Sequence, residues 1–261
     1  MSVPAARVAL VVLVLALASA PAGAGPTRKP VSLTAAPARV VLSGTTRAAV
    51  RLTNSGTKRV VIDASRAGFA LTLRGRPRIV RRRGARSAAS WLKLQPMSLV
   101  LLARTSASLG ILARVPRNAE PGDHDALVLL TTRPSAGVRV AVRVRLGVVV
   151  VVRAPGTVVR RLELRGLRVA RRGGRRMLEL RVANRGNVTE TLPRVYMTIS
   201  RPRTRRQLAT LLAARRAVRP HTQAIVDFRL PPLRVRAVSA HVVIPAGPGR
   251  SAIRRTYAIR L

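Results

Sequence analysis

The sequence predicts an all-β chain built from antiparallel β-sandwiches. The first observation is the segment Arg139–Arg153, RVAVRVRLGVVVVVR, in which valine or leucine alternates with arginine or alanine as far as Leu146. A period of two is typical of a strand with one buried and one solvated face. The unbroken valine run after Gly147 favours a strand covered on both faces. The second observation is a series of short segments of this kind, separated by turn residues, with almost no helical periodicity.

Two domains are predicted after a signal peptide, residues 1–24. Arg7 precedes an apolar run at 8–18, and small residues continue to Ala24. This is the pattern of a secretory signal, with cleavage expected after Ala24 or, alternatively, after Ala20 or Ala22. The run is shorter than the roughly 20 residues that span a bilayer, although an uncleaved N-terminal anchor is an alternative. We therefore expect a secreted or cell-envelope-associated protein without a transmembrane anchor after signal removal.

The first domain is expected at residues 31–154, as an immunoglobulin-like β-sandwich. Its predicted strands are 38–42, 47–53, 59–63, 69–73, 90–94, 106–115, 125–132 and 138–152. Gly, Pro, Ser and Asn residues between them indicate turns. Ala154-Pro155-Gly156 interrupts the strand pattern, so the domain boundary is placed there.

The second domain is expected at residues 157–261, as another immunoglobulin-like β-sandwich. Its predicted strands are 158–170, 177–183, 193–200, 223–230, 235–244 and 253–259. Gly173-Gly174 lies between two of these strands and predicts a two-residue hairpin turn. Segment 207–217 has leucines at helical spacing but is equally compatible with a strand and loops, so both alternatives stay open.

A short internal repeat supports two related domains. Val50-x-Leu52-x-Asn54-x-Gly56 matches Leu180-x-Val182-x-Asn184-x-Gly186. Both sequences predict a half-buried strand entering a turn, in which Asn bonds its own backbone and Gly takes a positive φ. A second match pairs 99–106 with 218–222, each an apolar segment, a polar turn and then a strand.

The formal net charge of +42 is extreme, and cysteine is absent. Without cysteine there are no disulfides, no thiolate chemistry and no Cys-based metal site. The surface should attract anions, with an affinity that falls as salt screens the charge. For an exported protein, anionic wall polymers, phospholipid head groups and acidic polysaccharides are the available partners.

Four arginines beside the Gly173-Gly174 turn are the candidate anion-binding residues: Arg171, Arg172, Arg175 and Arg176. Across a hairpin they would face like charges, which is locally destabilising. A bound polyanion would relieve that repulsion, because guanidinium groups grip phosphate or carboxylate bidentately. The alternative is a solvated basic loop, and the same choice applies to Arg81-Arg82-Arg83.

No catalytic or metal-binding constellation accompanies these features. His124 lies between Asp123 and Asp125, but Pro121-Gly122 favours a structural turn with these polar residues at its solvated mouth. The other acidic residues are scattered along the chain. We therefore expect no enzymatic activity, no cofactor and no metal. Trp91 is expected to anchor the core or a sheet edge.

Three segments resemble a known family: Trp91-Leu-Lys-Leu-Gln-Pro, Val115-Pro116-x-x-Ala119-x-Pro121-Gly122-Asp123-His124 and Arg145-Leu-Gly-Val-Val-Val-Val-Val. Their order resembles the N-terminal peptidoglycan-binding domain of bacterial WxL-interacting surface proteins, over about residues 31–156. The resemblance implies a non-enzymatic envelope protein whose second sandwich binds a host surface or partner. The chain departs from that family in its heavy arginine load, and we expect no C-terminal anchor.

Three functions follow as expectations. The first is an exported bacterial envelope protein that binds an anionic wall polymer, such as peptidoglycan or a teichoic-acid-like chain, or another surface protein. The second is a periplasmic pilus-type chaperone, which would offer an edge strand to the unfinished sheet of a subunit. The third is a polyanion or nucleic-acid binder. No specific nucleic acid is expected, because the basic patches lack interleaved aromatic residues.

Overall fold

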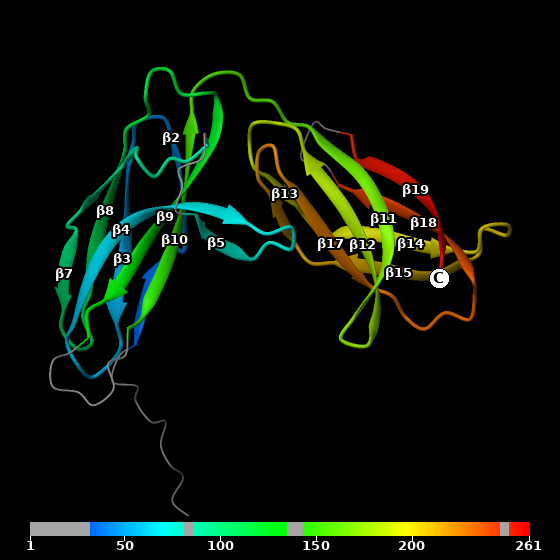
Figure 1. Cartoon of the computed structure of the whole chain (residues 1–261), viewed down its shortest axis with the longest axis horizontal. Coiled ribbons are helices and arrows are strands. Elements are labelled where there is room, and N and C mark those ends of the chain that lie inside the picture. Colours follow the sequence, from blue (N-terminus) through cyan, green and yellow to red (C-terminus); the bar gives the residue numbers. More distant parts are fainter. Residues whose placement is uncertain (1–31, 81–85, 135–142, 246–250) are drawn as a thin grey trace, which may run out of the picture.

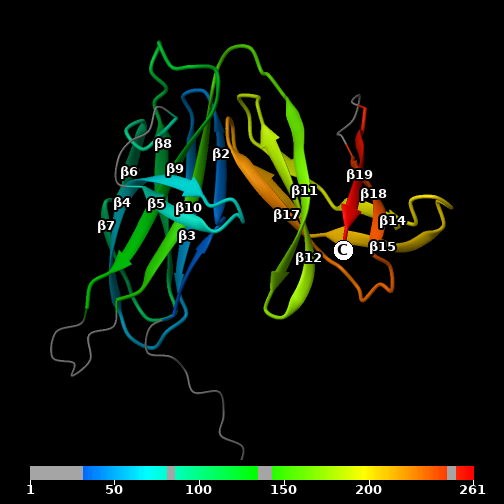
Figure 2. The same cartoon turned by 45° about the vertical axis from the view of Figure 1, so that its right-hand side comes forward.

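The computed structural model describes residues 32–80, 86–134, 143–245 and 251–261, and all the regular secondary structure in these ranges is β-strand. The predicted signal peptide, Arg81–Arg83 and the first residues of the Arg139–Arg153 segment lie outside the described residues. In the described part of the chain, no helix is long and apolar enough to cross a membrane. Two β-sandwiches stand side by side, joined by residues 155–161 (Figure 1 and Figure 2).

Domain 1 contains two facing sheets. One has the order β1-β3-β8-β6, formed by β1 (Leu33–Ala36), β3 (Arg47–Asn54), β8 (Ser106–Ala113) and β6 (Leu92–Gln95). The other has the order β2-β10-β9-β4-β5, formed by β2 (Arg39–Ser43), β10 (Arg145–Ala154), β9 (Gly122–Thr132), β4 (Val60–Leu71) and β5 (Pro77–Val80), with β7 (Ser98–Leu101) also paired to β4. All pairs are antiparallel except β2–β10. The alternating apolar side chains meet between the sheets in a core that includes Leu52, Ile62 and Val150.

Domain 2 repeats this plan. One sheet has the order β11-β12-β17, formed by β11 (Leu162–Arg172), β12 (Arg175–Asn184) and β17 (Gln223–Arg229). The other has the order β15-β14-β18-β19, formed by β15 (Gln207–Ala213), β14 (Val195–Ser200), β18 (Ala237–Ile244) and β19 (Ile253–Arg260). The short strands β13 (Glu190–Leu192) and β16 (Arg216–Val218) pair with each other. The core is aliphatic around Phe228, Leu180 and Met197.

The all-β prediction of two tandem antiparallel sandwiches is therefore confirmed. The two segments predicted at 59–63 and 69–73 form one continuous strand, β4. Segment 207–217, which was compatible with either helix or strand, forms β15 and the start of β16. Leu211 and Ala213 in β15 are buried while Leu212 between them is exposed, which is the period of a strand rather than a helix.

The internal repeat marks the same turn in both domains. Asn54 and Asn184 are fully buried, and each accepts a bond from the backbone N–H two residues later, at 3.0 and 2.9 Å. Each Nδ2 donates at 2.8 Å to the carbonyl four residues later and at 3.0 Å to a carbonyl of a distant segment, Leu102 or Val218. The expected positive φ at the two glycines is wrong, because neither adopts one. The buried asparagine fixes the turn instead.

Candidate functional site

The predicted hairpin arginines flank the Gly173-Gly174 turn, where both glycines have positive φ. Arg171 faces Arg176 and Arg172 faces Arg175 across the ladder. The four side chains do not gather on one point, however. Arg172 forms ion pairs with Glu179 at 2.9 Å and Asp227 at 3.6 Å. Arg175 and Arg176 instead border a hollow that is also lined by residues of β15 and of the end of β17. Anion binding at this tip stays a prediction.

Four of the eight acidic residues, far apart in sequence, lie where the two domains meet: Asp123, Asp125, Glu179 and Asp227. Arg74, in the turn between β4 and β5, reaches from domain 1 to Glu179 at 2.7 Å and to Asp227 at 3.0 Å. Glu179 is 3% exposed and also accepts bonds from Arg168 and Arg172. The same turn places Leu73 O against the free edge of β17, where it accepts a 2.7 Å bond from Ile225 N.

A second group of domain contacts surrounds the start of β9. Asp125 is buried and pairs with Arg219 of domain 2, and the Arg219 Nη1 also donates to Phe69 O at 2.6 Å. Asp123 accepts a 2.7 Å bond from Thr189 N of domain 2 and a 2.7 Å bond from Arg153. These charge-assisted bonds and backbone bonds together fix the two sandwiches to each other.

The prediction that His124 and its neighbours form the solvated mouth of a turn is wrong. Gly122 does turn the chain, with φ of 110°, but β9 begins at this glycine and Asp123, His124 and Asp125 are all buried. The imidazole packs on Trp91 with ring centroids 4.3 Å apart, and Nε2 lies 2.8 Å from Glu120 O. Trp91 packs against the domain 1 core, as expected. The described residues contain no group of acidic and histidine side chains suited to a metal ion.

The environments of these carboxyl groups shift their pKa values in different directions. Burial opposes ionisation of Glu179, but the bonds from Arg74 and Arg168 outweigh burial and hold its pKa below the ordinary value. The pKa of Asp123 is lowered in the same way, since bonds from Arg153 and Thr189 outweigh burial. Burial raises the pKa of Asp125, and the attraction of Arg219 offsets this only in part. The sequence does not predict the contacts of Glu179, Asp123 and Asp125 between the domains, because their partners lie far away in the chain and no local pattern indicates them.

The predicted valine strand β10 is covered on both faces and open along part of one edge. Val148, Val150 and Val152 face the core, while Val151 is 2% exposed and faces domain 2 beside Phe69 and Ala217. Parallel pairing with β2 covers residues 149–153 only. In the described part of the chain, residues 145–148 pair with β9 alone. The prediction of a strand buried on both faces after Gly147 is therefore confirmed.

The open edge carries backbone donors with nothing paired to them in the described residues. Val149 donates its N–H to Ala38 O at 3.0 Å, on the β2 side. Because N–H directions alternate along a strand, Arg145 and Gly147 direct their N–H groups to the same side, past the end of β2. Arg143 and Arg145 are exposed, whereas Val144 and Leu146 are half-buried. This segment, residues 143–148, is called the open edge below.

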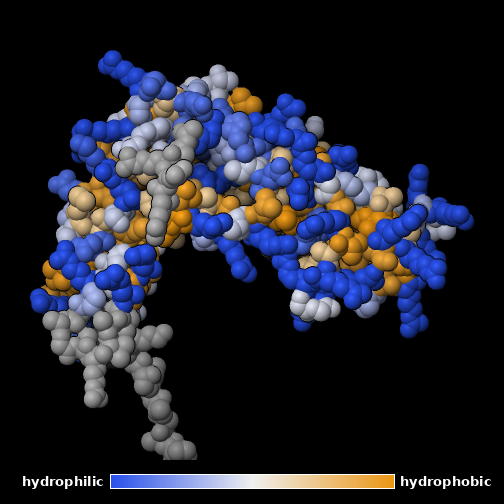
Figure 3. Space-filling view, in the orientation of Figure 1, coloured by the Kyte–Doolittle hydropathy of each residue, from blue (hydrophilic) through white to orange (hydrophobic). Residues whose placement is uncertain are grey.

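Figure 3 shows hydrophilic side chains over most of one face of the molecule, with hydrophobic residues between them on both domains. Every one of the eight acidic residues has an arginine within 4 Å. Because the chain holds 50 lysines and arginines, most of the positive charges have no carboxylate to neutralise them. The surface is therefore overwhelmingly cationic, as the composition predicts.

No family model and no curated protein sequence matches the chain. Among solved structures, a chain of the chaperone–tip adhesin complex of CFA/I fimbriae biogenesis has a TM-score of 0.50 at 11% identity, covering 86% of this chain and 98% of that one. The YadV chaperone gives 0.48 at 10% identity, with 88% and 100% covered. A chain of the Salmonella enterica SafA pilin–SafB chaperone complex gives 0.48 at 12% identity, with 88% and 98% covered. The chain thus has the two-domain immunoglobulin-like fold that is also found in fimbrial chaperones.

Proposed function

We propose that the protein is an exported, non-enzymatic chaperone that binds an extended segment of a surface subunit along the open edge. Strand addition to an exposed sheet edge gives affinity through main-chain hydrogen bonds and specificity through alternate side chains. The observation that carries the proposal is the open edge itself, where the N–H groups of Arg145 and Gly147 face away from β9 past the end of β2. The fimbrial chaperone–adhesin complex with the same fold supports a pilin-like or adhesin-like subunit as the partner.

The composition of the open edge suits reversible binding. Long apolar edges aggregate, and native proteins protect them with charged residues. Arg143 and Arg145 supply that charge on one face, whereas Val144 and Leu146 present apolar side chains toward the core side. An incoming strand with alternating apolar residues could continue the core layer, and acidic residues on its other face would meet the arginines.

The anchoring of β10 also supports this role. Its second half is held by β2 and β9 and covered by domain 2, so the open edge extends from a rigid strand. The ion pairs of Arg74 and Arg219 hold domain 2 in place beside it. A strand fixed in this way binds with little loss of its own conformational entropy.

Photo-cross-linking in the secreting cell tests the proposal. A photoreactive residue at exposed position 143 should cross-link to an exported surface subunit, identified by mass spectrometry. Arg145→Pro removes an N–H that faces the open side and no bond to β9, so the fold should persist while cross-linking falls at least about tenfold. Arg145→Gln is the matched control, because it removes the charge and keeps the N–H. Equal cross-linking in the proline variant, or cross-links to wall polymer alone, would refute strand addition.

Binding of an anionic wall polymer stays a separate prediction that rests on the net charge of +42. The resemblance of residues 31–156 to the WxL-interacting family, which rests on the three sequence segments named above, stays a prediction as well. Sedimentation with purified cell walls across a salt gradient tests it. Wall binding that declines with salt would support it, and no binding at low salt would exclude it.

A further inference from the structure

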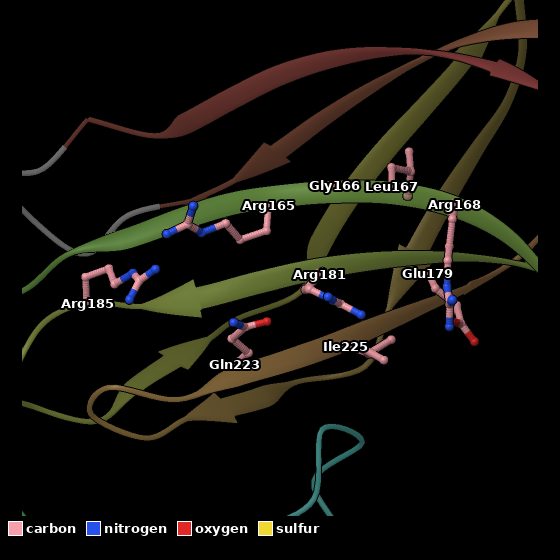
Figure 4. A pocket seen from close by; sticks show the side chains of 9 residues that line it. All are labelled: Arg165, Gly166, Leu167, Arg168, Glu179, Arg181, Arg185, Gln223 and Ile225. Atoms are coloured by element: carbon pink, nitrogen blue, oxygen red, sulfur yellow. The ribbon is translucent and has the colours of Figure 1, made fainter.

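A hollow of about 570 Å³ lies on the outer face of the β11-β12-β17 sheet, away from the domain 2 core (Figure 4). Four arginines line it: Arg165, Arg168, Arg181 and Arg185, together with Glu179, Gln223 and Ile225. Figure 4 shows the Arg181 side chain between the arginines of β11 and the side chains of β17. The residues that line the hollow include none of the four hairpin arginines and no residue of the open edge.

A β-bulge in β11 creates the hollow. The register with β12 shifts between Leu164 and Gly166, so Arg165 has no partner across the ladder and Gly166 faces Arg181. The extra residue places both Arg165 and Arg168 on the outer face, whereas strict alternation would turn one of them inward. Gly166 has no side chain, and a Cβ built on it meets nothing within 4 Å. Open space therefore lies above Arg181.

The carboxylates at this site are too few for the guanidinium groups. Arg168 pairs with Glu179 at 2.8 Å, and Arg165 and Arg185 share Glu163 at 2.7 and 3.6 Å. Both carboxylates have further arginine partners, since Glu179 also binds Arg74 and Arg172, and Glu163 also binds Arg161. Among the described residues, no carboxylate lies within 4 Å of Arg181.

We propose that this hollow binds a compact polyvalent oxyanion of the phosphate class, with two linked phosphate groups. Guanidinium forks bind phosphate oxygens bidentately, and several of them facing one space favour a ligand with more than one negative charge. A single carboxylate would neutralise only one of the arginines. The Gln223 side-chain amide supplies a neutral donor at the same wall. The site is independent of strand addition, so either proposal can fail without the other.

Titration calorimetry of the mature protein with pyrophosphate, at constant ionic strength, tests the site. Arg181→Gln should weaken binding at least about tenfold, which corresponds to about 1.4 kcal/mol. Gly166→Val should weaken it similarly by filling the space while leaving every charge in place. Arg260→Gln is the matched control: it removes the same charge from an exposed position of β19, in the other sheet of domain 2 and outside the hollow, and should change affinity less than about twofold.

Thermal unfolding of each variant checks that the fold is intact. Little change in Tm is expected, because neither Arg181 nor Gly166 belongs to the domain 2 core. The proposal is overturned if the wild-type protein does not bind pyrophosphate. It is also overturned if Arg260→Gln weakens binding as much as Arg181→Gln, since general charge attraction would then explain the affinity. Retained affinity in Gly166→Val would likewise place the anion elsewhere.

Discussion

Glu179→Gln is expected to weaken the contact between the domains. The carboxylate accepts four hydrogen bonds, from Arg74 at 2.7 Å, from Arg168 at 3.0 and 2.8 Å, and from Arg172 at 2.9 Å. Bonds to charged groups contribute roughly 1.5–3 kcal/mol each when fully desolvated. The arginine side chains are 33%, 64% and 43% exposed, so they recover much hydration once released, and glutamine retains one acceptor oxygen. The expected net loss is about 2–3 kcal/mol.

Differential scanning calorimetry measures this loss, which corresponds to a fall in Tm of roughly 5–10 °C for a chain of this size. Glu163→Gln is the matched control, because Glu163 also has three arginine partners, at 3.2, 2.7 and 3.6 Å, but none of them comes from domain 1. It is 27% exposed, and its loss should cost less than about 1 kcal/mol. Equal shifts in the two variants would show that removing one negative charge, and not the domain contact, determines stability.

Three further results are expected. Because the pKa of Glu179 is lowered in the folded protein, its contribution to the free energy of unfolding is present above the ordinary glutamate pKa and is lost as the pH falls through the folded pKa. Urea unfolding midpoints measured from pH 7 to pH 3 should therefore decline in the wild type and decline less in Glu179→Gln. Asn184→Ala should lose about 2–4 kcal/mol in urea unfolding, since three buried hydrogen bonds disappear, and Asn54→Ala should lose a similar amount; a loss below about 1 kcal/mol in both would contradict the role given to the turn. Arg219→Gln leaves the buried Asp125 carboxylate without its partner and should cost about 3 kcal/mol at neutral pH. Because burial raises the pKa of Asp125, part of that loss should return as the pH falls and the carboxyl group is protonated, and a deficit that grows on acidification would be inconsistent with this explanation.

Local patterns explain what the sequence predicts well. The valine and leucine alternation of β3, β10 and β12 is long enough to identify strands and their buried faces. Gly173-Gly174 correctly predicts the hairpin, and the matched asparagines correctly predict equivalent turns. Strands of three or four residues, such as β13 and β16, carry too few alternating positions to be recognised.

Contacts between distant segments explain what the sequence does not predict. Arg74 and Glu179 are far apart in the chain, and only the packing of the two sandwiches brings them together. Asp123 and Asp125 follow the turn signal Pro121-Gly122, which favours exposure, yet domain 2 covers them. The bulge that opens the space above Arg181 depends on a one-residue shift in strand pairing, and no composition or spacing rule identifies it.

The pairing of all eight acidic residues with arginine has a consequence for handling the protein. Each carboxylate is already engaged, so the surplus guanidinium groups repel one another with no internal counterion left to recruit. Dilute buffer therefore places the folded chain under its greatest self-repulsion, and moderate ionic strength relieves it. Purification at low conductivity should therefore lower the stability of the folded protein, and buffers that contain sulfate or phosphate should raise it.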